Sequence, residues 1–154
     1  MNLEFTNAKE AKQIKDLQNT KEYSFANLGE LKDIKDYISE NTDLGLKSTG
    51  KIFLKNILNL TGAEISLNYI PENTKAAFLH THKENEEVYI VLQGNGEFII
   101  NDNKLKIKAG SVIKVSTNAK RGINSGDNDL IVIVIQTKEN SLNYYTLSDA
   151  EIVK

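Results

Sequence analysis

The sequence of 154 residues contains no cysteine, which excludes disulfide bonds, thiolate metal ligands and a cysteine nucleophile. Neither sign of charge dominates, with 19 Lys and Arg against 21 Asp and Glu, so nothing favours a polyanionic partner such as a nucleic acid. No apolar run is long enough to cross a membrane, and the N-terminus lacks the basic and apolar regions of a signal peptide. We therefore expect a cytoplasmic protein, and one structural domain is the usual outcome at this length.

The first fifty residues carry a helical pattern of apolar side chains. Asn7 and Glu10 have the spacing of a capping box, and apolar residues follow with helical periodicity at Ala8, Ala11, Ile14 and Leu17. A second pattern starts at Asn27, and its apolar face is Leu28, Leu31, Ile34, Tyr37 and Ile38. Two helices this short need a larger body to pack on. We therefore predict a helical N-terminal extension, residues 1–50, packed on a main domain, residues 51–154.

After residue 50 the pattern changes to short runs rich in Ile, Val, Leu, Phe and Tyr, which is typical of strands. Ile131–Ile135 is wholly apolar, so we expect a central strand there. Turn residues cluster at 94–96, 101–103 and 124–128. Many short strands at regular spacing indicate an all-β sandwich or barrel. The expected strands are Lys51–Leu58, Ala63–Ile70, Ala76–His82, Glu87–Gln93, Gly96–Asn101, Lys104–Lys108, Ser111–Ser116, Leu130–Thr137 and Asn143–Leu147.

The two histidines of the chain, His80 and His82, lie one residue apart in one of these expected strands. Side chains at positions i and i+2 of a strand point to the same face, so both imidazoles should project together. The polar run 83–86 indicates a turn, after which Glu87 can return beside them. Two imidazoles and one carboxylate form a ligand set for Fe, Mn, Ni, Zn or Cu with open positions. The alternatives are a surface hairpin whose polar residues face water, and Glu86 as the ligand in a shifted register.

The spacing of these residues resembles the first signature motif of the cupin superfamily. His80-x-His82, four residues, Glu87, six residues and Gly94 fit that motif, and Gly110 with the following Ser-Val-Ile-Lys-Val resembles the start of the second. The likeness covers roughly residues 51–137 and points to small bacterial cupins. It implies a jelly-roll β-barrel, the double-stranded β-helix, in which the two histidines and the glutamate bind a divalent metal ion. Cupins are commonly dimers, and pairing of edge strands across a two-fold axis would give a homodimer.

Arg121 stands where many cupins have a histidine as a fourth ligand. Arginine stays protonated and has no free lone pair, so it cannot ligate a metal. The site then has three protein ligands, or no functional metal site survives. Two interpretations of Arg121 remain open: a rim residue in a salt bridge with Glu84 or Glu86, or a substrate-binding residue that grips a carboxylate or phosphate bidentately.

Tyr89 lies two residues after Glu87 and shares its strand face. We expect a core aromatic with a satisfied hydroxyl, and the alternative is a pocket hydroxyl that acts as an acid or hydrogen-bond donor. Tyr89 and Arg121 are the candidate catalytic residues. The leading hypothesis is a metalloenzyme of oxygenase, isomerase or lyase type that acts on a small anionic substrate. The alternatives are a non-catalytic cupin that binds a small acid or sugar, and a structural protein with a relic site.

Overall fold

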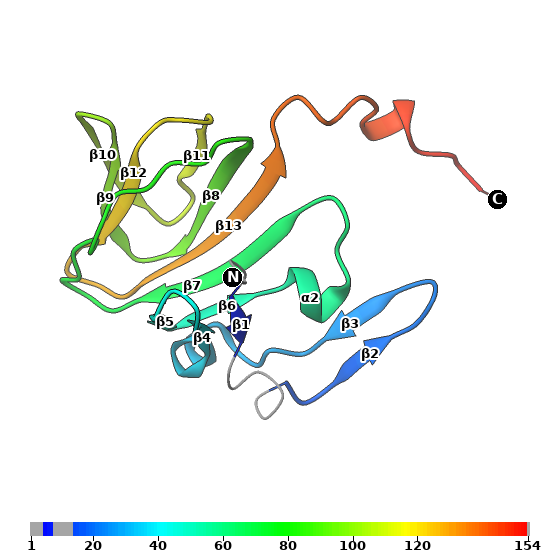
Figure 1. Ribbon diagram of the computed structural model, residues 1–154, viewed down its shortest axis with the longest axis horizontal. Helices are drawn as coiled ribbons and strands as arrows, with labels where there is room; N and C mark the ends of the chain where they lie inside the picture. Colours follow the sequence, from blue (N-terminus) through cyan, green and yellow to red (C-terminus); the bar gives the residue numbers. More distant parts are fainter. Residues whose placement is uncertain (1–4, 8–13, 154) are drawn as a thin grey trace.

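The computed structural model describes residues 5–7 and 14–153 of the chain. Two β-sheets that pack face to face form the body of the protein, and the N-terminal portion lies along the β6–β7 side of the larger sheet (Figure 1). The protein is therefore all-β, as the sequence predicts. Within the described ranges, no helix is long and apolar enough to span a membrane.

The larger sheet has five antiparallel strands, with the wholly apolar strand near its centre, as predicted. This strand, β13, pairs with β8 on one side and with β7 on the other, so that Val134 lies opposite both Tyr89 and Ser66. Its branched side chains suit a strand that is covered on its faces. In spatial order the strands are β11 (Val112–Val115), β8 (Asn85–Gln93), β13 (Leu130–Lys138), β7 (Glu64–Ile70) and β6 (Lys51–Phe53).

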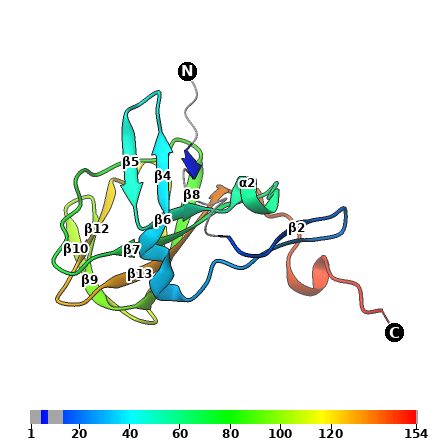
Figure 2. The same cartoon turned by 90° about the horizontal axis from the view of Figure 1, so that it is seen from below.

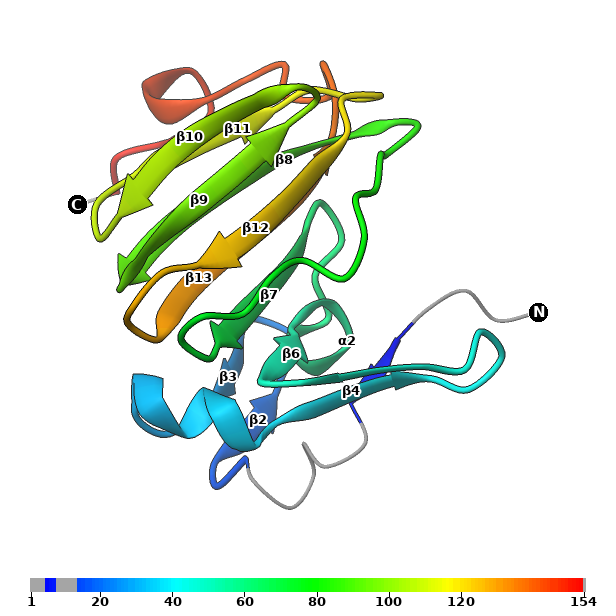
Figure 3. The ribbon, with the colours of Figure 1, turned by 90° about the vertical axis from the view of Figure 1, so that its left-hand side faces the viewer.

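The smaller sheet has three antiparallel strands, in the order β10 (Asn103–Lys108), β9 (Asn95–Ile100) and β12 (Arg121–Ser125). The turn between β9 and β10 falls where the sequence predicts it, and Asn101 adopts a φ of +50° there, which asparagine tolerates. The chain passes from β8 of one sheet to β9 of the other through Gly94 alone (Figure 3). The sequence pattern does not predict β12, because its last two residues, Asn124 and Ser125, belong to a run of turn-forming residues.

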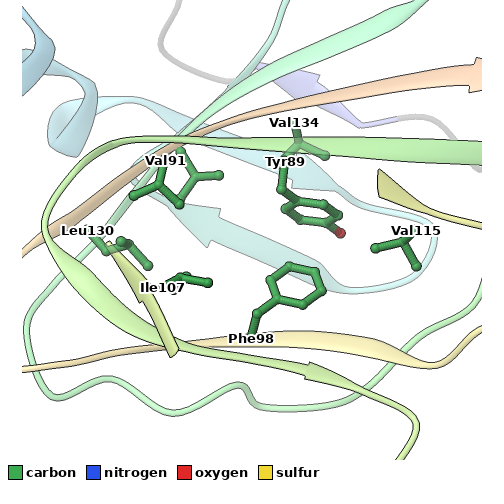
Figure 4. Packing of buried hydrophobic residues seen from close by; sticks show 8 residues of the cluster. Tyr89, Val91, Phe98, Ile107, Val115, Leu130 and Val134 are labelled. Carbon is green, nitrogen blue, oxygen red and sulfur yellow. The ribbon is translucent and has the colours of Figure 1, made fainter. Parts of the chain in front are cut away.

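The hydrophobic core fills the space between the two sheets (Figure 4). The ring of Tyr89 on β8 meets the ring of Phe98 on β9 edge to face, with 4.7 Å between centroids. Each such large side chain contributes about 1.5–3 kcal/mol when it is fully buried. The core consists of Tyr89, Val91, Phe98, Ile107, Val115, Leu130, Val132 and Val134. It fixes the two sheets relative to each other, and the candidate site lies at one end of it.

The sheets are not closed into a barrel, which corrects the expected jelly-roll barrel in this respect. Residues 71–84, between β7 and β8, belong to neither sheet. They meet β12 through an isolated bridge between His80 and Arg121 and through separate hydrogen bonds of Thr74 and Ala76 with the end of β12. The strand expected at 76–82 is therefore absent. Because residues 71–84 form no continuous strand pairing, the two sheets form a sandwich that is open along the side where this segment lies.

The described part of the N-terminal fifty residues has five short strands and one 3₁₀ helix instead of two α-helices, so the predicted helices are wrong here. Most of the first helix falls outside the described residues, and Leu17 lies in β2 (Leu17–Asn19), which pairs with β3 (Ser24–Ala26). In place of the second helix there is a short 3₁₀ helix, η1 (Leu31–Asp36). A three-stranded sheet follows, formed by β1 (Thr6–Asn7), β4 (Ile38–Asn41) and β5 (Leu46–Thr49); the β4–β5 hairpin projects from the body (Figure 2).

A second hydrophobic cluster attaches the N-terminal portion to the larger sheet. Ile34 and Tyr37, at η1, are buried with Ile52 of β6 and pack against Leu67 of β7. The short helix α2 (Lys55–Leu58) adds Ile57 to this cluster and replaces the second half of the strand expected there. These contacts attach the N-terminal portion to the larger sheet, and the division into an extension and a main domain at residue 50 stays a prediction. At the other end, the strand expected at 143–147 is absent, and the short helix η2 (Thr146–Ser148) lies in an exposed tail (Figure 1).

The crossing between the sheets requires a glycine at position 94. Gly94 has a φ of +85°, and a Cβ there would overlap the backbone carbonyl oxygen of Asp129. We expect Gly94→Ala to lower the free energy of unfolding by about 2–3 kcal/mol, measured by urea denaturation. Gly110→Ala is the matched control, because Gly110 has a φ of +90° but open space around it, so it should lose only about 1 kcal/mol. Equal losses in the two variants would contradict the overlap.

Candidate metal centre

His80 and His82 lie in the irregular segment before β8, close to β12. The backbone N–H of His80 donates to the carbonyl oxygen of Arg121 (3.1 Å), and the N–H of Arg121 donates to the carbonyl oxygen of His80 (2.9 Å). The N–H of Asn118 donates to the carbonyl oxygen of His82 (2.9 Å). The two imidazole rings come within 5.3 Å of each other, centroid to centroid. The predicted proximity of the imidazoles is therefore present, although no regular strand produces it.

Glu87 reaches the histidines from β8, on the face of that strand that points into the core. Burial alternates along β8, so that Glu87, Tyr89 and Val91 are all buried. The Oε1 of Glu87 lies 3.0 Å from Nε2 of His82, and its Oε2 lies 3.9 Å from Nε2 of His80. One ligand atom from each of the three residues can be chosen so that all lie within 4.8 Å of one another. Glu86 instead forms a salt bridge with Lys114 at 3.2 Å.

The chemistry of these three residues fits a metal ion. Nε2 of His82 is buried and has no hydrogen-bond partner in the described structure, because Oε1 of Glu87, although close, lies off the hydrogen-bonding direction. Buried polar atoms without a partner are rare. Histidine nitrogen and carboxylate oxygen bind metals at about 2.0–2.2 Å, so small side-chain shifts would let one ion contact all three residues. Such an ion would keep further coordination positions for a ligand.

Tyr89 is both a core residue and a partner of Glu87. Its ring is 6% exposed and packs on Phe98, while its hydroxyl donates a hydrogen bond to Oε2 of Glu87 at 2.6 Å. Burial, together with the charge of Glu87, raises the pKa of the Tyr89 hydroxyl. The hydroxyl therefore stays protonated at neutral pH and can donate to the carboxylate throughout. This geometry agrees with the expected core aromatic whose hydroxyl is satisfied; a catalytic role stays a prediction.

Arg121, the first residue of β12, is completely buried beside the same carboxylate. Its Nε lies 3.1 Å from Oε2 of Glu87, and its Nη2 donates to the carbonyl oxygen of Ser116 at 3.1 Å. Neither Nε nor Nη1 has a well-directed acceptor among the described residues. The contact with Glu87 is thus an ion pair rather than a linear hydrogen bond. Arg121 therefore adds a positive charge beside the three potential ligands.

The structure does not bear out a rim position for Arg121. Glu84 pairs with Lys138 at 3.6 Å and Glu86 with Lys114, so neither carboxylate pairs with the arginine. Arg121 also does not line the cavity beside the histidines. Direct binding of a substrate by Arg121 therefore stays a prediction.

The electrostatic setting favours the protonation states that metals need. Burial lowers the pKa of His80, although the negative charge of Glu87 opposes this effect. Burial by itself would raise the pKa of Glu87, but the contacts with His82 and Tyr89 and the charge of Arg121 hold it below its usual value. At neutral pH His80 is therefore neutral and Glu87 is ionised, which are the forms that ligate metals.

A cavity of about 530 Å³ lies directly beside these residues. His80, His82 and Glu87 line it together with Tyr89. Much of the remaining wall is apolar, with Phe53, Ile70, Phe78, Ile123, Val132 and Val134. Phe5 and the β4–β5 hairpin, through Leu46 and Ser48, also line it. The N-terminal portion therefore forms part of the cavity wall, through strands and loops rather than through helices.

Lys51 is a cavity residue that the sequence interpretation missed. It is the first residue of β6, and the sequence pattern predicts only that a strand begins there. The signal was present in the alternation Lys51, Ile52, Phe53, because a buried Ile52 turns its two neighbours to the opposite face. The sequence does not predict which face of β6 borders the histidines, because that depends on contacts between distant segments.

The fold, with a histidine pair and a glutamate at one end of a two-sheet sandwich, agrees with the comparisons with known proteins. Residues 68–136 match the family described as Cupin domain. A cupin protein of known structure from Bacteroides fragilis is 35% identical in sequence, with a TM-score of 0.65, and the match covers 68% of this chain and 89% of that one. The chain therefore belongs to the cupin family, as the sequence motif predicts.

More distant structures share the fold alone. A putative sugar phosphate isomerase from Acidithiobacillus ferrooxidans is 23% identical with a TM-score of 0.52, over 57% of this chain and 58% of that one. A DMSP lyase from Ruegeria pomeroyi is 16% identical with a TM-score of 0.53, over 66% of this chain and 53% of that one. The comparison with curated proteins gave no match. The family is therefore established, while the activity has to be argued from the site.

Proposed function

We propose that this cupin binds a divalent metal ion through His80, His82 and Glu87 and acts as a metalloenzyme on a small anionic molecule in the adjoining cavity. One observation carries the proposal: a buried His82 Nε2 without a hydrogen-bond partner lies in a cluster of three potential ligands at a cavity wall. The ligand set suits Fe, Mn, Ni, Zn or Cu. When bound, such an ion would act as a Lewis acid on an oxygen of the substrate.

The residues around the ligands would hold them in place. Tyr89 donates its hydroxyl hydrogen to Glu87, and Arg121 places its charge against the same carboxylate. Groups of this kind orient a metal-binding carboxylate and tune its basicity. We assign Arg121 to the positioning of Glu87 rather than to the substrate, because Arg121 does not line the cavity. The apolar wall would exclude water from the bound molecule and strengthen its polar contacts.

Metal analysis of the purified protein tests the proposal. We expect close to one divalent ion per chain by elemental analysis in non-chelating buffer, and a rise in melting temperature when metal is returned to chelator-treated protein. His82→Ala should weaken metal binding at least about tenfold, because one of three ligands is lost.

Glu86→Gln and Glu87→Gln form a matched pair for the carboxylate. The two residues are neighbours, but Glu86 pairs with Lys114 away from the histidines, so only Glu87→Gln should lose metal. Wild-type protein without stoichiometric metal and without a metal-dependent melting temperature would refute the metal centre.

A non-catalytic binding role is the second candidate. It is favoured by the hydroxyl of Tyr89, which already donates its hydrogen to Glu87 and whose pKa is raised, so it is a poor acid toward a bound molecule. In that role the cavity would hold a small acid or sugar without converting it. Turnover of a metal-bound small acid would separate the enzyme from the binding protein.

We further propose that the chain forms a homodimer and works in the cytoplasm. The dimer is supported by the edge strand β11, where Val112 is 65% exposed, since edge strands that present apolar side chains are commonly paired. A monomeric mass by light scattering would contradict the dimer.

A further inference from the structure

Lys51 places a positive charge in the cavity, away from the three potential metal ligands. It begins β6, an edge strand of the larger sheet, and pairs there with Asn68 of β7. Burial along β6 alternates, so Ile52 is packed in the second hydrophobic cluster while Lys51 and Phe53 face the cavity. The Nζ of Lys51 lies 4.7 Å from the centroid of the Phe53 ring.

In the part of the chain that the structure describes, this ammonium group has no counterion of its own. Among the described residues no carboxylate is in ion-pair contact with Nζ, and Glu87 and Glu64 act on it only at longer range. The nearby Lys47 of β5 is different, because it pairs with Glu40 at 3.0 Å. Burial lowers the pKa of Lys51, and the two glutamates oppose that shift. A partly buried charge without a partner costs stability, and such positions are typical of binding sites.

The rest of the cavity limits what could neutralise this charge. Most of its wall is aliphatic or aromatic, and the polar side chains near Lys51 are neutral, for example Asn68 and Ser66 of β7. Glu87 at the cavity wall disfavours a second negative charge. Arg121, the other buried cation, does not line the cavity. The volume of about 530 Å³ is in the range of small-molecule sites.

We propose that Lys51 is the anion-binding residue of this cavity and that it takes the carboxylate of a small monocarboxylic acid with an apolar body. Ser66 lies on the neighbouring strand, where its hydroxyl accepts a hydrogen bond from Nδ2 of Asn68 at 3.0 Å and can donate its own hydrogen to a polar atom of the acid. This proposal rests on the proposed function only for the far end of the acid, which would reach the metal ion. A dianion such as a phosphate monoester fits less well, because one ammonium group would face two charges.

Binding of benzoate, benzamide and phenyl phosphate to the full-length protein tests the proposal, with titration calorimetry or ligand-observed NMR as the readout. The three probes share an aromatic body and differ in charge. We expect wild-type protein to bind benzoate at least about tenfold more tightly than benzamide, and also more tightly than phenyl phosphate. Lys51→Met, which keeps the apolar stem, should bind benzoate and benzamide about equally. Lys51→Arg should keep the preference for benzoate.

Lys47→Met is the matched control, because it removes a lysine on β5 that is paired with Glu40 and does not line the cavity. It should behave as wild type. The proposal is overturned if wild-type protein does not bind benzoate, binds benzoate and benzamide equally, or prefers phenyl phosphate. It is also overturned if Lys51→Met keeps the preference for benzoate over benzamide.

Titrations with and without added metal separate this proposal from the metal centre. A preference for benzoate in protein that binds no metal would support the role of Lys51 and refute the metal centre. Protein that binds stoichiometric metal but shows no preference for benzoate over benzamide would support the metal centre and refute the role of Lys51.

Lys51→Met also has an expected effect on stability. The pKa of Lys51 in the folded protein lies below its usual value of 10.5 because of burial. Below the folded pKa, the full cost of burying the charge is present, and it shrinks as pH rises toward 10.5, where the unfolded chain also loses its proton. Thermal unfolding should therefore show Lys51→Met to be more stable than wild type at pH 7, with a gain that falls at alkaline pH. A Lys51→Met protein less stable than wild type at pH 7 would show that the lysine is not an unpaired charge.

Discussion

Arg121→Ala is expected to lower the free energy of unfolding of the metal-free protein by about 3–5 kcal/mol, measured by urea denaturation. Arg121 is completely buried and Glu87 is 2% exposed, with 3.1 Å between Nε and Oε2. Without the guanidinium, the carboxylate stays in the interior beside Tyr89 and the two histidines, none of which carries the fixed positive charge of an arginine. A buried charge whose partner has been removed is one of the few single changes that cost this much.

Two further measurements show whether the lost stability comes from the charge on Glu87. A divalent metal should restore much of the stability of Arg121→Ala, because the ion compensates the same carboxylate. The double variant Arg121→Ala with Glu87→Gln should be more stable than the sum of the two single losses predicts, since no unpaired charge remains. Additive losses in the double variant would mean that the arginine stabilises the fold through its packing alone.

Sequence reasoning succeeded where the deciding interactions are local. The turn at Asn101 and the alternating or wholly apolar runs around it predict β8, β9, β10 and β13, because turn chemistry and side-chain period act within a few residues. The candidate metal centre is a partly local case. Because His80, His82 and Glu87 are close in the chain, their spacing predicts that they lie near each other, but backbone hydrogen bonds with Arg121 and Asn118 hold the histidines in place of the predicted strand.

The errors arose where non-local contacts or a different helical period decided the structure. The apolar residues of the second predicted helix recur every three positions, at Leu28, Leu31, Ile34 and Tyr37. This spacing fits the three residues per turn of a 3₁₀ helix as well as it fits one face of an α-helix. The residues after Tyr37 then form β4, because pairing with β5 outweighs the local preference.

The burial of Arg121 also depends on a distant contact. Arg121, Gly122 and Asn124 have weak strand preferences, yet β12 forms because it pairs with β9 more than twenty residues earlier in the chain. That pairing turns Arg121 toward Glu87. Sequence reasoning could identify the position as the site of a missing ligand, but it could not place the guanidinium on the carboxylate.

Arg121→His is expected to raise the affinity for Zn or Ni by roughly 100-fold, or about 2.7 kcal/mol, measured by competition with a chromophoric chelator. The Nε2 of a histidine is separated from its Cα by the same number of bonds as the Nε of an arginine. An imidazole at position 121 could therefore place a nitrogen close to Oε2 of Glu87, where Arg121 Nε now lies. The substitution adds a fourth ligand and removes a positive charge that repels the ion.

Arg121→Leu separates these two contributions to the affinity of the histidine variant. Both substitutions remove the positive charge and leave Glu87 without its ion pair, so they share the effect on the metal-free protein. Only the histidine provides a further ligand atom, and the leucine variant should therefore show a smaller rise in affinity. If the two variants bind metal equally, the imidazole does not reach the ion; if neither binds more tightly than wild type, the arginine does not oppose the metal. The gap between the two variants measures what an imidazole ligand at position 121 adds to the proposed metal site, and the difference between Arg121→Leu and wild type measures the effect of the positive charge.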